Sequence, residues 1–150
     1  MAGIGDLQPR IGADQARIID SSQSASDPLL YRALTQQIIG AALAVHRELG
    51  PGFLEKVYET AMLIELAEKG IAALSQAEIP VSYHLRPVGF YFADILVDGK
   101  VICEIKAAQA IVAAHEAQLL HYLKATGLQV GFIFNFGARS LAYRRLAKSR

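Results

Sequence analysis

The sequence predicts a single α/β domain with a small mixed sheet. Two segments, residues 29–50 and 53–70, space their apolar residues as amphipathic helices do, and they end at Gly50 and Gly70. The middle of the chain instead carries β-branched and aromatic runs, which are typical of strands. A further helical segment then separates two strand-like runs, and such a crossover allows the last strand to lie parallel to an earlier one.

Three β-rich runs follow the two helices. They occupy residues 78–85, 89–97 and 101–106. Asp98-Gly99, between the second and third runs, is typical of a hairpin turn. Residues 113–127 return to helical spacing, and residues 128–136 have the composition of a buried strand. The basic segment at residues 140–150 is compatible with either a strand or a helix.

Composition limits the class of protein and its partners. A chain of 150 residues that is 53% hydrophobic can bury the core of one domain, which we place at residues 29–150. Residues 1–28 lack apolar periodicity and contain the polar run SSQSASDP, so we expect a flexible N-terminal tail there. The net charge of +1 gives no general attraction to polyanions, so a nucleic-acid partner needs a local patch.

Cysteine usage and hydropathy predict a cellular compartment. The single cysteine, Cys103, excludes an intrachain disulfide and a multi-cysteine metal cage, and its strand position predicts a buried thiol in a reducing compartment. The chain has no long uncharged apolar run and no basic-then-apolar signal pattern at its N-terminus. We therefore expect a cytoplasmic protein with no membrane partner.

The run VICEIK, residues 101–106, places an acid and a base on one predicted strand. Because side chains alternate along a strand, Glu104 and Lys106 share a face. A half-exposed strand with a charged outer face explains this pair. A metal site whose bound water is held by the lysine is the alternative, and for this run taken alone the charged outer face is preferred.

Whether Asp94 joins that face depends on the length of the hairpin turn. A two-residue loop of Asp98-Gly99 sends Asp94 to the opposite face, whereas a three-residue loop over residues 97–99 points it the same way as Glu104, diagonally across the ladder. Two carboxylates so placed can share one hard cation. The other explanation is a cross-strand ion pair with the lysine, worth under about 1 kcal/mol if exposed.

Several short motifs of this chain resemble those of the PD-(D/E)XK nuclease superfamily, and most closely those of its RecB-type branch. In order, they are Gly89-Phe-Tyr-Phe-Ala-Asp94, Glu104-Ile-Lys106 and Gln118-Leu-Leu-His-Tyr122. Upstream, Gly52-Phe-Leu-Glu55-Lys-Val-Tyr58 resembles the signature of the small GxxExxY protein family. The resemblance extends over roughly residues 30–147.

The resemblance implies a restriction-endonuclease-like mixed sheet flanked by helices, and a metal-dependent nuclease. Asp94 and Glu104 match the metal ligands, for magnesium or manganese, and Glu55 on the second helix matches the residue that completes the acidic cluster. Lys106 would hold the attacking water and offset charge in the transition state. Gln118 and Tyr122 would orient the metal-bound water or a phosphate by hydrogen bonds.

Three of these residues also have ordinary structural explanations. Glu55 is an acid in the first turn of a helix, where the helix dipole favours it. Gln118 and Tyr122, spaced i, i+4, can form the polar edge of an amphipathic helix. For His115 and His121 the structural explanation is preferred over a metal-binding one.

Taken together, the residues and the resemblance predict a hydrolase that cleaves phosphodiester bonds, with DNA as the expected nucleic acid. A catalytically inactive nucleic-acid- or protein-binding module on the same scaffold is the competing function, because a fold does not fix an activity. A metal-assisted phosphoesterase for small nucleotides is a third. The small size favours specificity supplied by a partner or a homodimer. The aromatic residues are assigned mostly to the core, so no stacking platform for single strands is expected.

Overall fold

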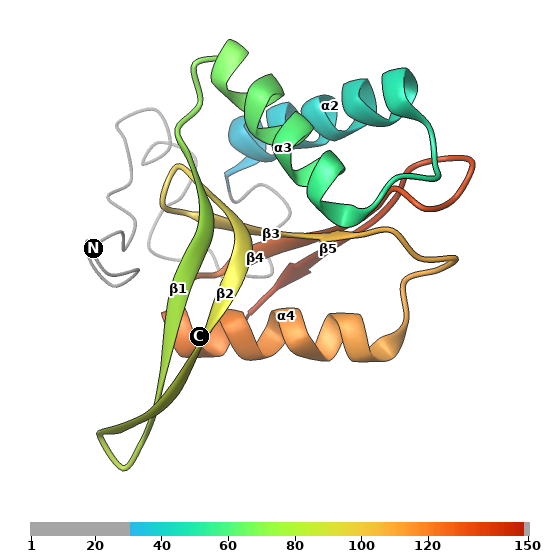
Figure 1. Cartoon of the computed structure of the whole chain (residues 1–150). Coiled ribbons are helices and arrows are strands. Elements are labelled where there is room, and N and C mark those ends of the chain that lie inside the picture. Colours follow the sequence, from blue (N-terminus) through green and yellow to red (C-terminus); the bar gives the residue numbers. More distant parts are fainter. Residues whose placement is uncertain (1–30, 149–150) are drawn as a thin grey trace.

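A five-stranded mixed sheet separates two helices on one face from a third helix on the other (Figure 1). The computed structural model describes residues 31–148. The sheet has the order β1-β2-β3-β4-β5, and only β3 and β4 run parallel. The predicted α/β class with a mixed sheet is therefore confirmed. The predicted tail, residues 1–28, lies outside the described residues.

The first layer consists of α2, Arg32–Leu49, and α3, Glu55–Glu68. Both helices are a few residues shorter than predicted. α2 ends where expected, because Gly50 takes a φ of 68° and its N–H donates to His46 O at 2.8 Å. α2 buries one apolar stripe against the sheet: Leu34, Ile38, Ala41, Ala42 and Val45.

Tyr58 fixes the turn between these helices to the sheet. Its hydroxyl donates to Gly50 O at 2.6 Å and accepts a hydrogen bond from Phe53 N–H at 3.1 Å. Its ring stacks on Phe136 with centroids 4.7 Å apart, and the side chain is fully buried. Tyr58 therefore holds the start of α3, and with it Glu55, at a fixed place above the sheet.

The strands are longer at the first hairpin than the sequence indicated. β1 spans Ala73–Tyr83 and β2 spans Arg86–Val97, whereas runs beginning at residues 78 and 89 were predicted. The remaining elements are β3, Val101–Lys106; α4, Ala113–Thr126; β4, Val130–Asn135; and β5, Ala142–Ala147. The ambiguous basic segment thus contains a strand, which pairs antiparallel with β4.

The crossover helix α4 covers the other face of the sheet and packs closely on β4. Leu119 and Leu123 are fully buried in the core between them. A Cβ at Gly131 would lie 2.7 Å from Leu119 Cδ1, so a larger residue there would require the Leu119 side chain to move. As predicted, the crossover makes β3 and β4 parallel, with Lys106 opposite Asn135.

The hairpin turn between β2 and β3 combines both predicted possibilities. Asp98 and Gly99 have φ values of 52° and 64°, and Lys100 N–H donates to Val97 O at 2.9 Å, as in a two-residue turn. The ladder nevertheless pairs Val97 with Val101, which leaves Lys100 as an extra residue. The loop is therefore three residues long but covers residues 98–100, so Leu96 pairs with Ile102 and the pairing predicted for a three-residue loop, Leu96 with Lys100, was wrong by two residues.

Tertiary contacts of Lys100 explain why the extra residue is placed there. The side chain is buried, forms an ion pair with Asp98 at 3.1 Å and lies 6.0 Å from the ring centroid of Tyr31. With this register, Asp94 and Glu104 lie opposite each other on the same face of the hairpin.

About halfway along their length, both β1 and β2 change from packing against one helical layer to packing against the other. Ile95 belongs to the core under α2 and α3, whereas Ala93, two residues earlier, belongs to the core over α4. In the register, Gln76 lies opposite Asp94, has a φ of 53° and interrupts the ladder. A left-handed residue within a strand turns the strand and breaks its pairing, so Asp94 sits where the sheet opens.

Beyond this kink the hairpin extends past the sheet as an arm, residues 80–91 (Figure 1). Exposed aromatic side chains lie along it and at its base. Tyr83, Phe90, Tyr91 and Phe92 leave between 47% and 65% of their surface exposed. The expectation that the aromatic residues lie mostly in the core was wrong for this arm, because neither helical layer extends far enough to cover it.

Two further expectations concern Cys103 and the membrane. Cys103 is a free, fully buried thiol, as predicted. Within residues 31–148, no helix is both long and apolar enough to cross a membrane.

Candidate active site

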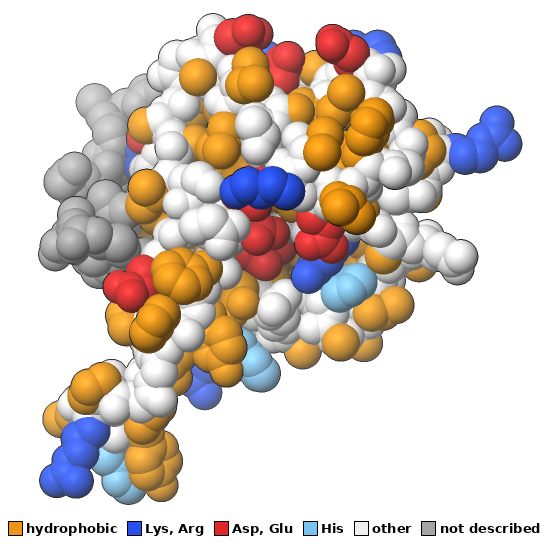
Figure 2. All heavy atoms as spheres, viewed as in Figure 1, with side chains coloured by type: hydrophobic (Ala, Val, Ile, Leu, Met, Phe, Trp, Pro, Cys, Tyr) orange, Lys and Arg blue, Asp and Glu red, His pale blue; other side chains and the backbone are white. Residues whose placement is uncertain are grey.

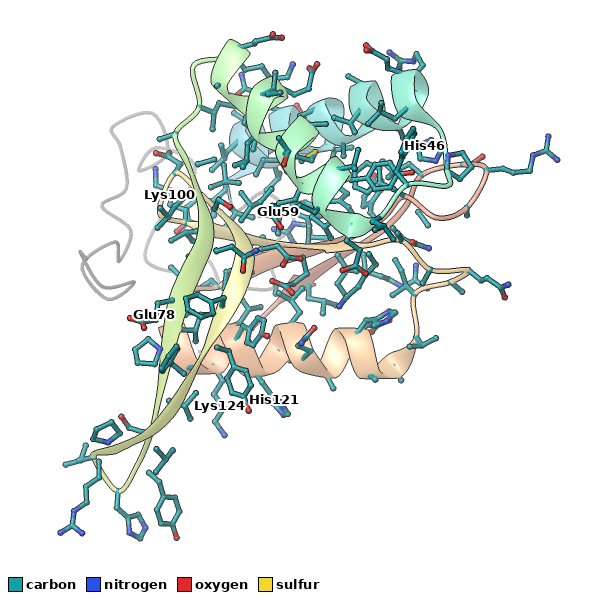
Figure 3. All side chains as sticks on the ribbon, in the orientation of Figure 1. His46, Glu59, Glu78, Lys100, His121 and Lys124 are labelled. Atoms are coloured by element: carbon teal, nitrogen blue, oxygen red, sulfur yellow. The ribbon has the colours of Figure 1, made fainter. Side chains whose placement is uncertain are left out.

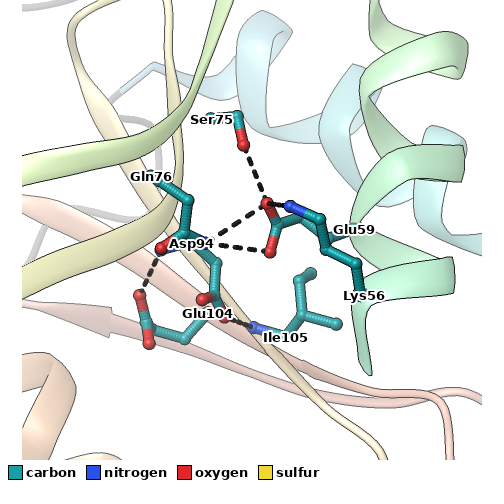
Figure 4. A network of polar contacts seen from close by, with 7 residues as sticks. All are labelled: Lys56, Glu59, Ser75, Gln76, Asp94, Glu104 and Ile105. Atoms are coloured by element: carbon teal, nitrogen blue, oxygen red, sulfur yellow. Dashed lines mark hydrogen bonds and ion pairs between the residues drawn. The ribbon is translucent and has the colours of Figure 1, made fainter. Parts of the chain in front are cut away.

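Asp94 and Glu104 hold the strands of the hairpin together where its backbone ladder ends. Asp94 N–H donates to Glu104 Oε2 at 2.9 Å, and Ile105 N–H donates to Asp94 Oδ2 at 2.7 Å (Figure 4). The last ladder pair before this point joins Ile95 to Cys103. Two carboxylates thus replace the backbone acceptors, and each is fixed by the opposite strand.

Burial makes this carboxylate pair electrostatically unfavourable when both members are charged. Glu104 is 3% exposed, and burial, followed by the charge of Asp94, raises its pKa to about 8. Burial also raises the pKa of Asp94, with a further contribution from the charge of Glu59, although the hydrogen bond from Ile105 opposes this shift. At neutral pH the pair therefore favours a bound proton or a nearby cation.

Lys106 supplies a positive charge on the same face. It follows Glu104 by two residues on β3, and its charge lowers the pKa of both Asp94 and Glu104 against the effect of burial. Its Nζ donates to Gln118 Oε1 at 3.2 Å, so α4 holds the ammonium group in place. The amide of Gln118 thereby connects the crossover helix to the carboxylate pair.

Tyr122 lies one helical turn after Gln118 and is largely buried. Burial, followed by the charges of Glu104 and Asp94, raises the pKa of Tyr122, and a hydrogen bond with Gln118 acts in the opposite direction. The phenol therefore remains protonated across the physiological range and can act as a hydrogen-bond donor. The structure brings together Asp94, Glu104, Lys106, Gln118 and Tyr122.

Glu55 occupies the edge of this group. It is the first residue of α3 and is exposed, and its charge raises the pKa of both Asp94 and Glu104. Its charge therefore acts on the carboxylate pair from the opposite helical layer. Its role as a metal ligand stays a prediction.

Glu59, one turn after Glu55, is a site residue that the sequence interpretation missed. It is buried and accepts hydrogen bonds from Ser75 Oγ at 2.8 Å and Gln76 Nε2 at 3.0 Å, and it pairs with Lys56 at 3.3 Å (Figure 4). The i, i+4 spacing from Glu55 was the signal that could have found it, because that spacing places both acids on one helix face. Glu59 fixes the left-handed Gln76 and thus the opening in the sheet beside Asp94.

The donor set suits a cation that retains much of its own water. Asp94 Oδ1 and Glu104 Oε1 have no hydrogen-bond partner in the described part of the chain, and the second oxygen of each residue is held by backbone N–H. No group of three or more His, Cys, Asp or Glu side chains within residues 31–148 could hold a metal ion. Magnesium commonly uses one or two carboxylates together with waters and substrate phosphates, so the pair fits that ion.

Other polar residues near the site have structural roles. His115 Nδ1 accepts a hydrogen bond from Val112 N–H at 3.1 Å, which gives His115 a structural role at the start of α4. Asn135, fully buried at the end of β4, accepts from Ala108 N–H at 2.9 Å and donates to Ala108 O at 3.0 Å. Asn135 therefore fixes the chain immediately after Lys106.

The surface of the molecule is hollowed where these elements meet. Figure 2 shows acidic side chains gathered in the middle of one face, with basic side chains above and below them, between the upper helices and the lower helix.

Comparison with known proteins assigns the family. The model of the PD-(D/E)XK nuclease superfamily matches residues 32–146, which include α2 at one end and nearly all of β5 at the other. This chain belongs to the PD-(D/E)XK nuclease superfamily. The restriction-endonuclease-like fold implied by the motifs is therefore confirmed for this PD-(D/E)XK domain. The narrower resemblance to GxxExxY proteins stays a prediction.

One solved protein supports the fold. The crystal structure of SSO0001 superimposes with a TM-score of 0.51 at 13% sequence identity. The match covers 85% of this PD-(D/E)XK chain, which spans 64% of the length of that chain. At such low identity the likeness concerns the fold alone. No curated protein matches the chain.

Proposed function

We propose that this protein is a metal-dependent nuclease that hydrolyses phosphodiester bonds in DNA. The proposal rests mainly on the pair formed by the half-buried Asp94 and the buried Glu104, whose charges require compensation, with Lys106 on the same face. Membership of the PD-(D/E)XK superfamily supports a nuclease-type function in general. DNA as the substrate rests on the likeness of the motifs to RecB-type nucleases.

In the proposed reaction, the carboxylates of Asp94 and Glu104 and the carbonyl of Ile105 would hold a magnesium or manganese ion. The ion, when bound, supplies a Lewis acid for a phosphate oxygen and lowers the pKa of a bound water. Lys106 orients the attacking water and offsets the negative charge of the transition state. Gln118 keeps the ammonium of Lys106 in place through the 3.2 Å hydrogen bond.

A binding module without activity is the competing function. Such a module has no use for the buried carboxylate of Glu104 beside the half-buried carboxylate of Asp94, because burying carboxylates without compensation disfavours folding. The arrangement of Asp94, Glu104 and Lys106 therefore favours catalysis. A small-nucleotide phosphoesterase is distinguished from a nuclease only by the size of its substrate.

A cleavage assay tests the proposal. Supercoiled plasmid, linear duplex, single-stranded DNA and RNA are incubated with the protein in magnesium, in manganese and in EDTA. We expect metal-dependent cleavage of DNA by the parent and none by Glu104→Gln. The control is Lys69→Ala, an exposed change next to the end of α3, which should cleave like the parent.

The substrates distinguish the competing functions. Cleavage of RNA alone would replace DNA as the substrate, and hydrolysis of small phosphodiesters alone would favour the phosphoesterase. Metal-independent cleavage, or equal cleavage by Glu104→Gln, would contradict the proposed mechanism.

A further inference from the structure

A groove of about 780 Å³ runs between the arm and α4, beside the candidate active site. One wall is formed by the arm and the other by α4. The side chains that matter here are Tyr91 on the arm and Gln118, His121, Tyr122 and Lys124 on α4. Figure 3 shows His121 and Lys124 at the side of α4 that is next to the hairpin.

The groove is linked to the carboxylate pair by two side chains of α4, Gln118 and Tyr122. Gln118 lines the groove and also accepts the hydrogen bond from Lys106, which neighbours Glu104 on the same face. Tyr122 likewise lines the groove, while the charges of Glu104 and Asp94 act on its phenol. The groove therefore lies close to the place where the scissile phosphate of a polymer is expected.

The chemistry of the walls suits a base and a phosphate. Tyr91 is 58% exposed, and its ring lies 6.0 Å from that of Tyr122 at an interplanar angle of 39°, so much of its surface remains free for a further planar group. Lys124 provides a positive charge, and none of the described residues that line the groove is acidic. Aromatic faces beside a basic side chain are typical of single-strand binding sites.

We propose that this groove binds an unpaired stretch of nucleic acid next to the scissile phosphate, with a base on the ring of Tyr91 and a phosphate on Lys124. The proposal deepens the proposed nuclease function and rests on it for the position of the scissile bond. The groove volume falls within the range of about 300–1,000 Å³ that is common for sites enclosing small ligands. A base inside a duplex has both faces covered by its neighbours, so an unpaired base is better suited to stack on Tyr91.

The groove is tested by binding in EDTA, so that no cleavage occurs. A labelled oligothymidine of about 12 nucleotides, within the usual site size, is compared with a blunt duplex by fluorescence anisotropy. We expect the parent to bind the single strand more tightly than the duplex. Tyr91→Ala should weaken single-strand binding roughly tenfold, as is usual for loss of one stacked base, and Tyr91→Phe should retain it.

The effect of Lys124→Ala is measured from the dependence of single-strand affinity on salt concentration. Loss of one phosphate contact should lower the slope of log affinity against log salt by about 1. Tyr83→Ala, at the exposed end of the arm, and Lys69→Ala, next to the end of α3, are the matched controls and should bind like the parent. Circular dichroism of each variant checks that it is folded.

The inference would be overturned by parent affinity in both Tyr91→Ala and Lys124→Ala, by equal affinity for duplex and single strand, or by no binding of the single strand. These outcomes are separate from failure of the nuclease function. Single-strand binding that depends on Tyr91, without any metal-dependent cleavage, would retain the groove and reject the nuclease. Metal-dependent cleavage by the parent, together with parent-like single-strand binding by the groove variants, would retain the nuclease and reject the groove.

Discussion

Asp94 and Glu104 each have two properties that disfavour a charged carboxylate in a folded protein. Each is a desolvated carboxylate, and each lies close to another negative charge. Hydrogen bonds from Asp94 N–H and Ile105 N–H and the charge of Lys106 offset this only in part, since burial still raises the pKa of both acids. The site therefore favours a bound proton or a cation beside these two carboxylates.

The raised pKa of Glu104 predicts that the metal-free protein becomes less stable as pH rises. The folded state retains a proton up to a pKa of about 8, whereas the unfolded state loses it near the ordinary value of 4.5. Between these values the folded state binds more protons, so the free energy of unfolding falls with increasing pH, by at most about 5 kcal/mol.

Urea denaturation in EDTA at pH 5 and pH 8 measures this loss. Glu104→Gln keeps an acceptor oxygen for Asp94 N–H but cannot ionise, so its stability should depend less on pH and exceed that of the parent at pH 8. Magnesium should stabilise the parent at pH 8 and not the variant, because the ion binds only the charged pair. A parent whose stability is the same at both pH values would contradict the assigned burial effect.

Lys106 is expected to act on the transition state more than on the bound ion. Lys106→Ala should abolish detectable cleavage yet leave manganese affinity within a few-fold of the parent, whereas Asp94→Ala should lose both. Calorimetric titration with manganese and a cleavage time course measure the two properties on the same samples. Equal loss of manganese binding in Lys106→Ala would assign the lysine to the metal site instead.

At the scale of elements, the order of helices and strands could be predicted because their apolar periodicity is local. The strand pairing could not. Asp98-Gly99 fits a two-residue turn, and the extra Lys100 is placed by contacts with Asp98 and Tyr31 that only the folded protein contains. The kink at Gln76 also has no local signal, since no glycine marks the left-handed position.

That kink provides a test of backbone strain. Gln76 has a φ of 53°, where alanine is disfavoured and glycine is not. Both Gln76→Ala and Gln76→Gly lose the hydrogen bonds to Glu59, so both should be destabilised. Gln76→Gly should nevertheless be the more stable of the two, by about 1 kcal/mol in urea denaturation. The opposite order, which is usual inside regular strands, would mean that the strand does not need this conformation.

The family could be inferred from the motifs, but the positions of their residues required the whole molecule. Asp94, Glu104, Lys106 and Gln118 were identified in sequence, and the folded chain places them between two helical layers. Glu59 and Tyr91 were not identified. Glu59 acts through Gln76 from another element, and Tyr91 is exposed because α4 borders this part of the arm without covering it.

The arm should contribute little to the stability of the whole domain. Its outer residues, among them Tyr83, Leu85 and Val88, are largely exposed. Replacing residues 82–88 with Asn-Gly, a favoured two-residue hairpin turn, should change the free energy of unfolding by less than about 1 kcal/mol. Urea denaturation of the shortened protein measures the change, and a loss of several kcal/mol would show that the arm packs against the rest of the protein.

The central claim is that Asp94 and Glu104 together hold a divalent cation. The most direct test is a calorimetric titration of the metal-free parent with manganese at pH 7, repeated in buffers of different ionisation enthalpy, alongside Asp94→Asn and Glu104→Gln. We predict that the parent binds the ion with release of a proton, because the raised pKa of Glu104 keeps that acid protonated before binding, and that each variant loses binding. Absence of binding at millimolar manganese, or equal binding by either variant, would contradict the claim.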